Sequence, residues 1–163
     1  MVKTLLKEVK EYKKDTLLSP AYVSIEAILE VLIPFLMALL VDNGIEKGKM
    51  SSIWFYGILM LVAAFVSLWA GAKSGKHAAI ASSGFAKNLR KVEYRNIQNF
   101  SFSNIDAYST SGLITRMMTD VTNIQNAYQM IIRVCVRAPL MLIASLIMAF
   151  IINKETVSYT HLR

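Results

Sequence analysis

The chain has 163 residues, of which 55% are apolar, and its mean hydropathy is +0.43. Its net charge of +7 would suit a nucleic-acid-binding protein, but the basic residues flank apolar stretches as membrane topology requires, so nucleic acid is excluded as a partner. A single cysteine excludes a disulfide framework, and the sequence holds no Cys/His cluster with metal-ligand spacing. We expect an all-α membrane protein that contacts the lipid bilayer and has no metal site.

The N-terminal segment, residues 1–16, is basic and amphipathic. Leu5, Leu6, Val9 and Tyr12 fall on one helical face, and five lysines surround them. This pattern predicts a helix that lies at the cytoplasmic membrane surface. A frayed polar N-terminus is the alternative.

The first predicted span, residues 17–41, is long enough to cross a bilayer with some tilt. Within it Glu26 and Glu30 stand one helical turn apart, and Pro34 follows on the next turn. Carboxylates inside a membrane are costly and face a bundle interior or a water-filled cavity. Two interpretations stay open: Glu26, Glu30 and Pro34 line a cavity that interacts with cationic solutes, or the two carboxylates are packing groups, protonated or hydrogen-bonded between helices.

Two further spans follow. Residues 53–72 contain no charged residue and have tryptophans near both ends, as expected for a span anchored at two interfaces. The third apolar stretch begins near Val134 and continues to residue 152. Five lysines in the N-terminal segment and nine basic residues in 73–137, against two in the turn 42–52, place the N-terminus inside.

Between the second and third spans the apolar residues keep helical spacing on both sides of one short break. We therefore predict that the second helix continues to about residue 100, that residues 101–110 form a break, and that a third helix covers 111–152. From Lys73 to Phe100 such a helix would reach roughly 40 Å. These two extensions form a long hairpin in the cytoplasm.

Residues 70–77 resemble a phosphate-binding loop, but Ala70 replaces the first glycine, His77 replaces Ser/Thr, and a membrane helix precedes the segment where the motif needs a strand. No catalytic constellation is present, so we expect that this chain is not itself an enzyme.

The stretch 100–120 resembles the first intracellular loop of ATP-binding-cassette (ABC) exporters. In that family a short coupling helix precedes the motif G-[DE]-L-x-[ST]-R-x-x-x-D. Here Leu113, Thr115, Arg116 and Asp120 match by position, whereas Ser111 and Gly112 depart from the pattern, in the manner of the bacterial multidrug-type branch. Pro34 followed by residues 41–45 resembles the end of the family's first helix, and the N-terminal segment resembles its elbow helix.

The resemblance implies the first half of a six-helix, type-1 transmembrane domain in a bacterial inner membrane. It implies ATP and magnesium in a separate nucleotide-binding domain, and a second transporter half, identical or different, as partner. Arg116 and Asp120 would either serve coupling or form an exposed ion pair. The coupling helix would comprise Asn104, Ile105, Asp106, Ala107, Tyr108 and Ser109, with Ile105 and Tyr108 as docking side chains.

Three helices cannot form the six-helix half, so we expect the natural protein to continue beyond about residue 153 into its C-terminal half and nucleotide-binding domain. Residues 157–163 resemble a translated sequencing adapter and are expected to be non-native. The competing class is a non-transport, three-helix membrane protein whose long cytoplasmic hairpin binds a partner.

Overall fold

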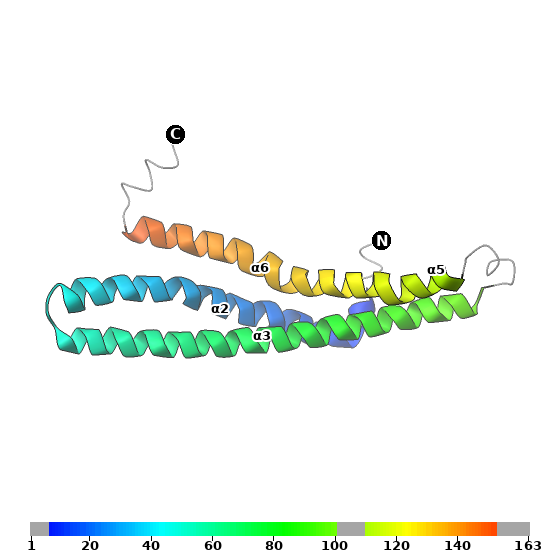
Figure 1. The fold of residues 1–163 in the computed structure, drawn as a ribbon, viewed down its shortest axis with the longest axis horizontal. Helices are drawn as coiled ribbons and strands as arrows, with labels where there is room; N and C mark the ends of the chain where they lie inside the picture. The colour runs from blue at the N-terminus through cyan, green and yellow to red at the C-terminus, as the bar shows by residue number, and fades with distance from the viewer. Residues whose placement is uncertain (1–6, 101–109, 153–163) are drawn as a thin grey trace, which may run out of the picture. The chain divides into compact units, whose positions relative to one another are not determined.

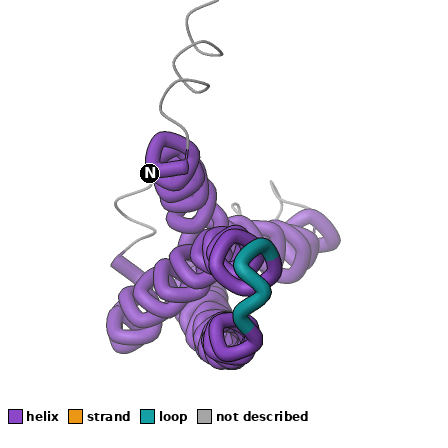
Figure 2. Tube along the Cα trace, turned by 90° about the vertical axis from the view of Figure 1, so that its left-hand side faces the viewer, coloured by secondary structure: helices purple, strands orange, loops and turns teal. Residues whose placement is uncertain are grey.

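The computed structural model describes residues 7–100 and 110–152 of the chain. Within these residues there is no strand (Figure 2), which confirms the all-α class. The elements in order are the 3-10 helix η1 (Lys7–Tyr12), α2 (Lys13–Leu40), the π-helix η2 (Val41–Ile45), α3 (Met50–Gln98), α5 (Thr110–Thr115), the π-helix η3 (Arg116–Asp120) and α6 (Val121–Ile152). Figure 1 labels α2, α3, α5 and α6.

Three helical stretches are long and apolar enough to cross a membrane, namely Glu8–Ile45, Met50–Gln98 and Ser111–Ile151. The predicted continuity of the second helix is confirmed, because α3 runs without interruption for 49 residues. The third helix begins at Thr110 and continues through η3 into α6. The turn between the first two spans is shorter than expected, since helical structure extends to Ile45 and resumes at Met50.

The chain forms two compact units, which we treat separately. Of the described residues, the span unit contains Pro20–Ser74 and 134–152. The hairpin unit contains 7–19, 75–100 and 110–133.

In the span unit, α3 buries small side chains and exposes large ones. Ala63, Ser67, Ala70 and Ser74 are buried along one face, which lets a neighbouring helix backbone approach closely. Phe65, Leu68 and many other large apolar side chains of α3 are exposed. This distribution is typical of a helix whose outer surface meets lipid or further membrane helices.

The hairpin unit has an ordinary apolar core, formed by Val9, Ala78, Ala81, Phe85, Tyr128 and Ile132. A second cluster of Ala86, Leu89 and Val121 adjoins Ile124. Phe85 and Leu89 of α3 and Val121 and Tyr128 of the third helix therefore face the core at helical spacing. Next to them Ile132 is 7% exposed, whereas Ile131 is 56% exposed.

The N-terminal segment differs from the predicted surface helix. In its described part a 3-10 helix ends at Tyr12, with Lys10 at a φ of 40°, and α2 then begins at Lys13. Val9 is buried, and a Cβ on Gly84 of α3 would overlap the Tyr12 ring. The Asn88 side-chain amide also donates to the Glu8 carbonyl at 2.9 Å. In the described part of the segment, Val9 and Tyr12 thus pack against protein.

Candidate functional site

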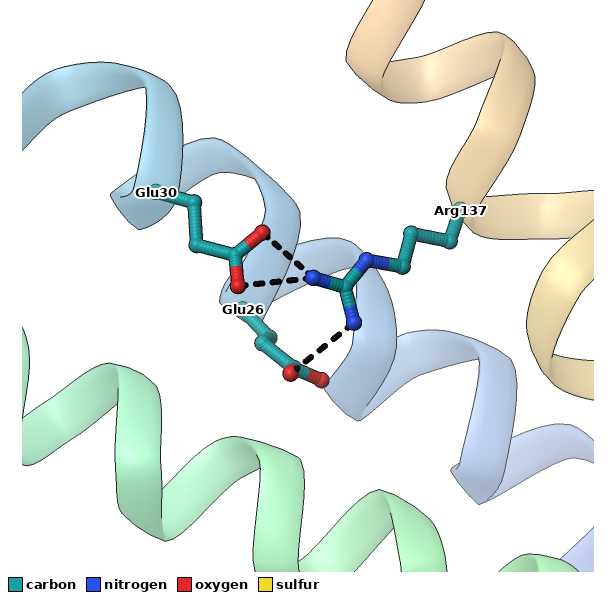
Figure 3. A network of polar contacts seen from close by, with 3 residues as sticks. All are labelled: Glu26, Glu30 and Arg137. Atoms are coloured by element: carbon teal, nitrogen blue, oxygen red, sulfur yellow. Dashed lines mark hydrogen bonds and ion pairs between the residues drawn. The ribbon is translucent and has the colours of Figure 1, made fainter.

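The span unit contains a cluster of three ionisable side chains. Glu26 and Glu30 of α2 point toward Arg137 of α6 (Figure 3). Arg137 Nη1 donates to Glu26 Oε1 at 3.2 Å, and Nη2 donates to both carboxylate oxygens of Glu30 at 2.7 Å. Because the two glutamates are one helical turn apart, a single guanidinium reaches both of them.

Two carboxyl groups share one guanidinium in this cluster, so with both carboxyls ionised the negative charges outnumber the positive charge by one. The imbalance is greatest at Glu26, whose side chain is 13% exposed and whose Oε2 is buried without a hydrogen bond. Charged groups in a membrane span are stable only when paired or solvated. The cluster therefore retains the capacity to bind a further positive charge or proton donor.

Two grooves adjoin the cluster. The first has a volume of about 460 Å³ and lies between α2 and α3, lined by Glu26, Glu30, Ile33, Ala64, Ser67, Leu68, Gly71 and Ala72. Gly71 gives the carboxylate its space, since a Cβ there would lie 2.9 Å from Glu26 Oε1. The second groove, of about 420 Å³, lies between α2 and α6 and is lined by Glu30, Val31, Pro34, Phe35, Met141, Ser145, Met148 and Ala149.

The structure thus places Glu26, Glu30 and Pro34 in the walls of these grooves. It also places Arg137 in the cluster, although the sequence analysis assigned Arg137 to the cytoplasmic hairpin. A signal for Arg137 was present. It is the only Lys or Arg within residues 17–41, 53–72 and 134–152. Because ionisable side chains inside a membrane usually pair with one another, two glutamates in one span predict a basic partner in another.

The motif residues lie in the hairpin unit. Leu113 and Thr115 belong to α5, and the Thr115 hydroxyl donates to the Ser111 carbonyl at 3.0 Å. Arg116 and Asp120 are the first and last residues of η3. The predicted coupling residues Asn104, Ile105, Asp106, Ala107, Tyr108 and Ser109 lie outside the described residues.

A small cavity of about 180 Å³ separates α3 from the motif segment, lined by Glu93, Asn96, Ile97, Phe100, Leu113, Arg116 and Met117. Glu93 lies 21 residues beyond the apolar stretch 53–72, roughly 30 Å along the helix and outside the span. Burial raises its pKa above the ordinary value of 4.5, the charge of Asp120 raises it further, and Arg90 opposes both. Its Oε2 is buried without a hydrogen bond.

Replacing Glu93 by glutamine is expected to stabilise the hairpin unit at neutral pH. A carboxyl with a raised folded-state pKa favours folding fully below pH 4.5, and this contribution is lost as the pH rises through the raised value. The gain from Gln should therefore grow between pH 5 and 8 and stay below about 1 kcal/mol, because the group is partly screened. Melting temperatures against pH, with the exposed Glu11→Gln as control, provide the measurement; a gain that shrinks with pH would contradict the assignment.

The segment 70–77 lies within α3 and forms no loop, so it cannot cradle a phosphate. His77 Nδ1 contacts Asp15 Oδ1 at 2.7 Å, which ties the start of α2 to α3 within the hairpin unit. Among residues 7–100 and 110–152, no three His, Cys, Asp or Glu side chains gather as metal ligands would.

Comparison with known proteins identifies the family. The family model described as "ABC transporter transmembrane region" matches residues 19–157. An uncharacterized ABC transporter ATP-binding protein of Bacillus subtilis, YfiB, is 34% identical over 130 residues, which are 80% of this chain and 23% of the relative. A similarly named protein of Mycobacterium bovis, Mb1304c, is 26% identical over 157 residues, which are 91% of this chain and 26% of the relative. The chain spans about a quarter of the length of these relatives. With three long apolar helices of the expected order, it belongs to the ABC transporter transmembrane-region family.

Proposed function

We propose that this chain is the N-terminal membrane part of an ATP-driven exporter, in which the hairpin formed by α3 and α5–η3–α6 receives motion from a nucleotide-binding domain. The observation that carries the proposal is the length of α3. Its 49 residues extend about 74 Å, more than twice the roughly 30 Å thickness of the hydrocarbon core. A continuous helix that extends beyond the bilayer can convert displacement at its tip into repacking within the bilayer.

The finer assignments follow the same proposal. Residues 104–109 act as the coupling helix, with Ile105 and Tyr108 docking on a nucleotide-binding domain that binds ATP and magnesium. A second transporter half completes the translocation pathway. The protein resides in a bacterial inner membrane with its N-terminus in the cytoplasm, as the distribution of lysine and arginine favours.

We assign the Glu26–Glu30–Arg137 cluster to the translocation pathway, with a preference for cationic or zwitterionic solutes. The cluster adjoins two grooves and carries a net negative charge. Such a site attracts cations and repels anions of the same shape.

The test uses the complete protein that contains this chain, in inside-out vesicles, with tetraphenylphosphonium as cation and tetraphenylborate as anion of similar shape. We expect uptake of the cation that requires ATP hydrolysis. The triple variant Glu26→Gln, Glu30→Gln, Arg137→Gln removes all three charges, with isosteric changes at the two glutamates and a shorter side chain at position 137, and should reduce cation uptake at least tenfold, about 1.4 kcal/mol.

Two outcomes would count against these assignments. Unchanged cation uptake by the triple variant, together with a reduced membrane yield, would make the cluster a packing element only. Absence of any ATP-driven uptake, together with stable capture of another protein by the hairpin, would favour the non-transport alternative.

A further inference from the structure

Arg137 occupies the position that a bound cation would take. Its guanidinium contacts Glu30 at 2.7 Å and Glu26 at 3.2 Å, and no other Lys or Arg lies within the predicted spans. Carboxylates that already hold an organic cation with good geometry can hold another of the same charge. The cluster is thus a cation site in which the bound cation is the side chain of Arg137 of α6.

Arg137 satisfies the two carboxylates unequally. Glu30 receives two short contacts, whereas Glu26 receives one longer contact and keeps Oε2 buried without a hydrogen bond. An unpaired, buried carboxylate oxygen costs free energy that a nearby cation would recover. The carboxylate that is still able to pair with a further cation is therefore that of Glu26.

Glu26 lines the groove between α2 and α3, so a cation in that groove would lie beside its carboxylate. The groove volume of about 460 Å³ lies in the range of small-molecule sites, and the walls beyond the two glutamates and Ser67 are apolar. A ligand that fits carries one positive charge on a largely apolar body.

Both helices joined by Arg137 are weakened beside the cluster. Pro34 stands four residues after Glu30 and so leaves the Glu30 carbonyl without its helical hydrogen bond, and Pro139 stands two residues after Arg137. Helices bend at such positions at low cost. The ion pairs of Arg137 thus hold together two helices that are each able to bend beside the contact.

We propose that a substrate cation in this groove binds Glu26 and displaces Arg137 from it, so that loading of the site leaves α6 tied to α2 through Glu30 alone and loosens the contact between the two helices. This proposal rests on the proposed transport function and adds to it a direct competition between the substrate and a residue of the chain. Arg137 then has two roles. It supplies a positive charge to the empty site, and its displacement by the substrate changes the contact between α2 and α6.

Competition is tested by equilibrium binding of tetraphenylphosphonium to the complete protein in nanodiscs without ATP. In Arg137→Lys a single ammonium replaces the guanidinium that contacts both carboxylates, so the side chain at position 137 competes less well with the probe. Tetraphenylphosphonium should therefore bind about three- to tenfold more tightly. Glu26→Gln keeps the Arg137–Glu30 pair and should weaken the probe about tenfold. Arg133→Lys, the same change one turn earlier on α6, is the matched control and should leave the affinity unchanged.

Loosening of the contact is tested by pulsed electron paramagnetic resonance with spin labels at the exposed positions Met37 of α2 and Ile147 of α6, in a Cys135→Ser background. Saturating tetraphenylphosphonium should lengthen the distance in the wild type, and Arg137→Lys should show a longer component before the probe is added. Arg137→Lys that binds the probe no more tightly than wild type, or a distance that saturation leaves unchanged, would overturn the proposal. Both measurements omit ATP, so their failure is distinct from a failure of ATP-driven transport.

Discussion

Replacing Arg137 by leucine is expected to destabilise the protein by about 3 kcal/mol and to lower its membrane yield sharply. The change leaves Glu26 and Glu30 one turn apart within the first span, without the guanidinium that contacts both. Removing one partner of an ion pair within a span strands the other, and an uncompensated charge there costs a few kcal/mol. Thermal unfolding followed by fluorescence-detected size exclusion measures the loss.

The uncharged triple variant Glu26→Gln, Glu30→Gln, Arg137→Gln separates stranded charge from lost packing. If charge is the cause, the triple variant should recover most of the stability that Arg137→Leu loses. A triple variant as unstable as Arg137→Leu would show that the side-chain volume of Arg137, rather than its charge, holds α2 and α6 together.

The second large effect is expected at Tyr128 in the hairpin unit. Tyr128→Ala should cost about 3–5 kcal/mol, since the ring is 7% exposed and its centroid lies 4.8 Å from that of Phe85. The Thr16 hydroxyl donates its only hydrogen to the Tyr12 carbonyl at 2.9 Å, so the Tyr128 hydroxyl is the donor in its 2.8 Å contact with Thr16. Tyr128→Phe keeps the ring and loses this bond, at a cost of about 1 kcal/mol.

Melting temperatures of the complete protein measure these costs. Tyr94→Ala is the matched control, because Tyr94 is exposed on α3 in the same unit and should change the melting temperature little. Limited proteolysis adds a local readout: Tyr128→Ala should speed cleavage near Tyr12, since it removes the contacts that hold the start of α2. Equal losses for Tyr128→Ala and Tyr94→Ala would contradict the assigned core.

Much of this fold is predictable from the sequence because the patterns that indicate its helices extend over many residues. Runs such as 53–72 contain no charge, and Phe85 and Leu89 repeat at helical spacing over many turns. The extension of α3 to Gln98 and the start of the third helix at Thr110 follow from those patterns.

The parts that the sequence did not predict depend on tertiary contacts. Arg137 was assigned to the hairpin because charge counting does not say which helix lies opposite Glu30. The N-terminal segment has the same amphipathic pattern whether membrane or protein covers it, and tertiary contacts such as the close approach of Gly84 to Tyr12 show that protein covers Val9 and Tyr12. The π-helix η3 leaves no compositional signal, because Arg116 to Asp120 are compatible with an ordinary α-helix.

The π-helix η3 has a consequence for the phase of the whole third helix. Leu113, Met117 and Val121 follow one another in steps of four, and over two such steps an α-helix would overshoot its face by about 80°. The wider turn absorbs this excess, and Arg90 Nε donates to the Met117 carbonyl there at 3.4 Å. The motif segment therefore contains the equivalent of one inserted residue. A one-residue deletion within 116–120 can be accommodated by reverting to α-helix, whereas the same deletion near Tyr128 would rotate every motif residue away from α3.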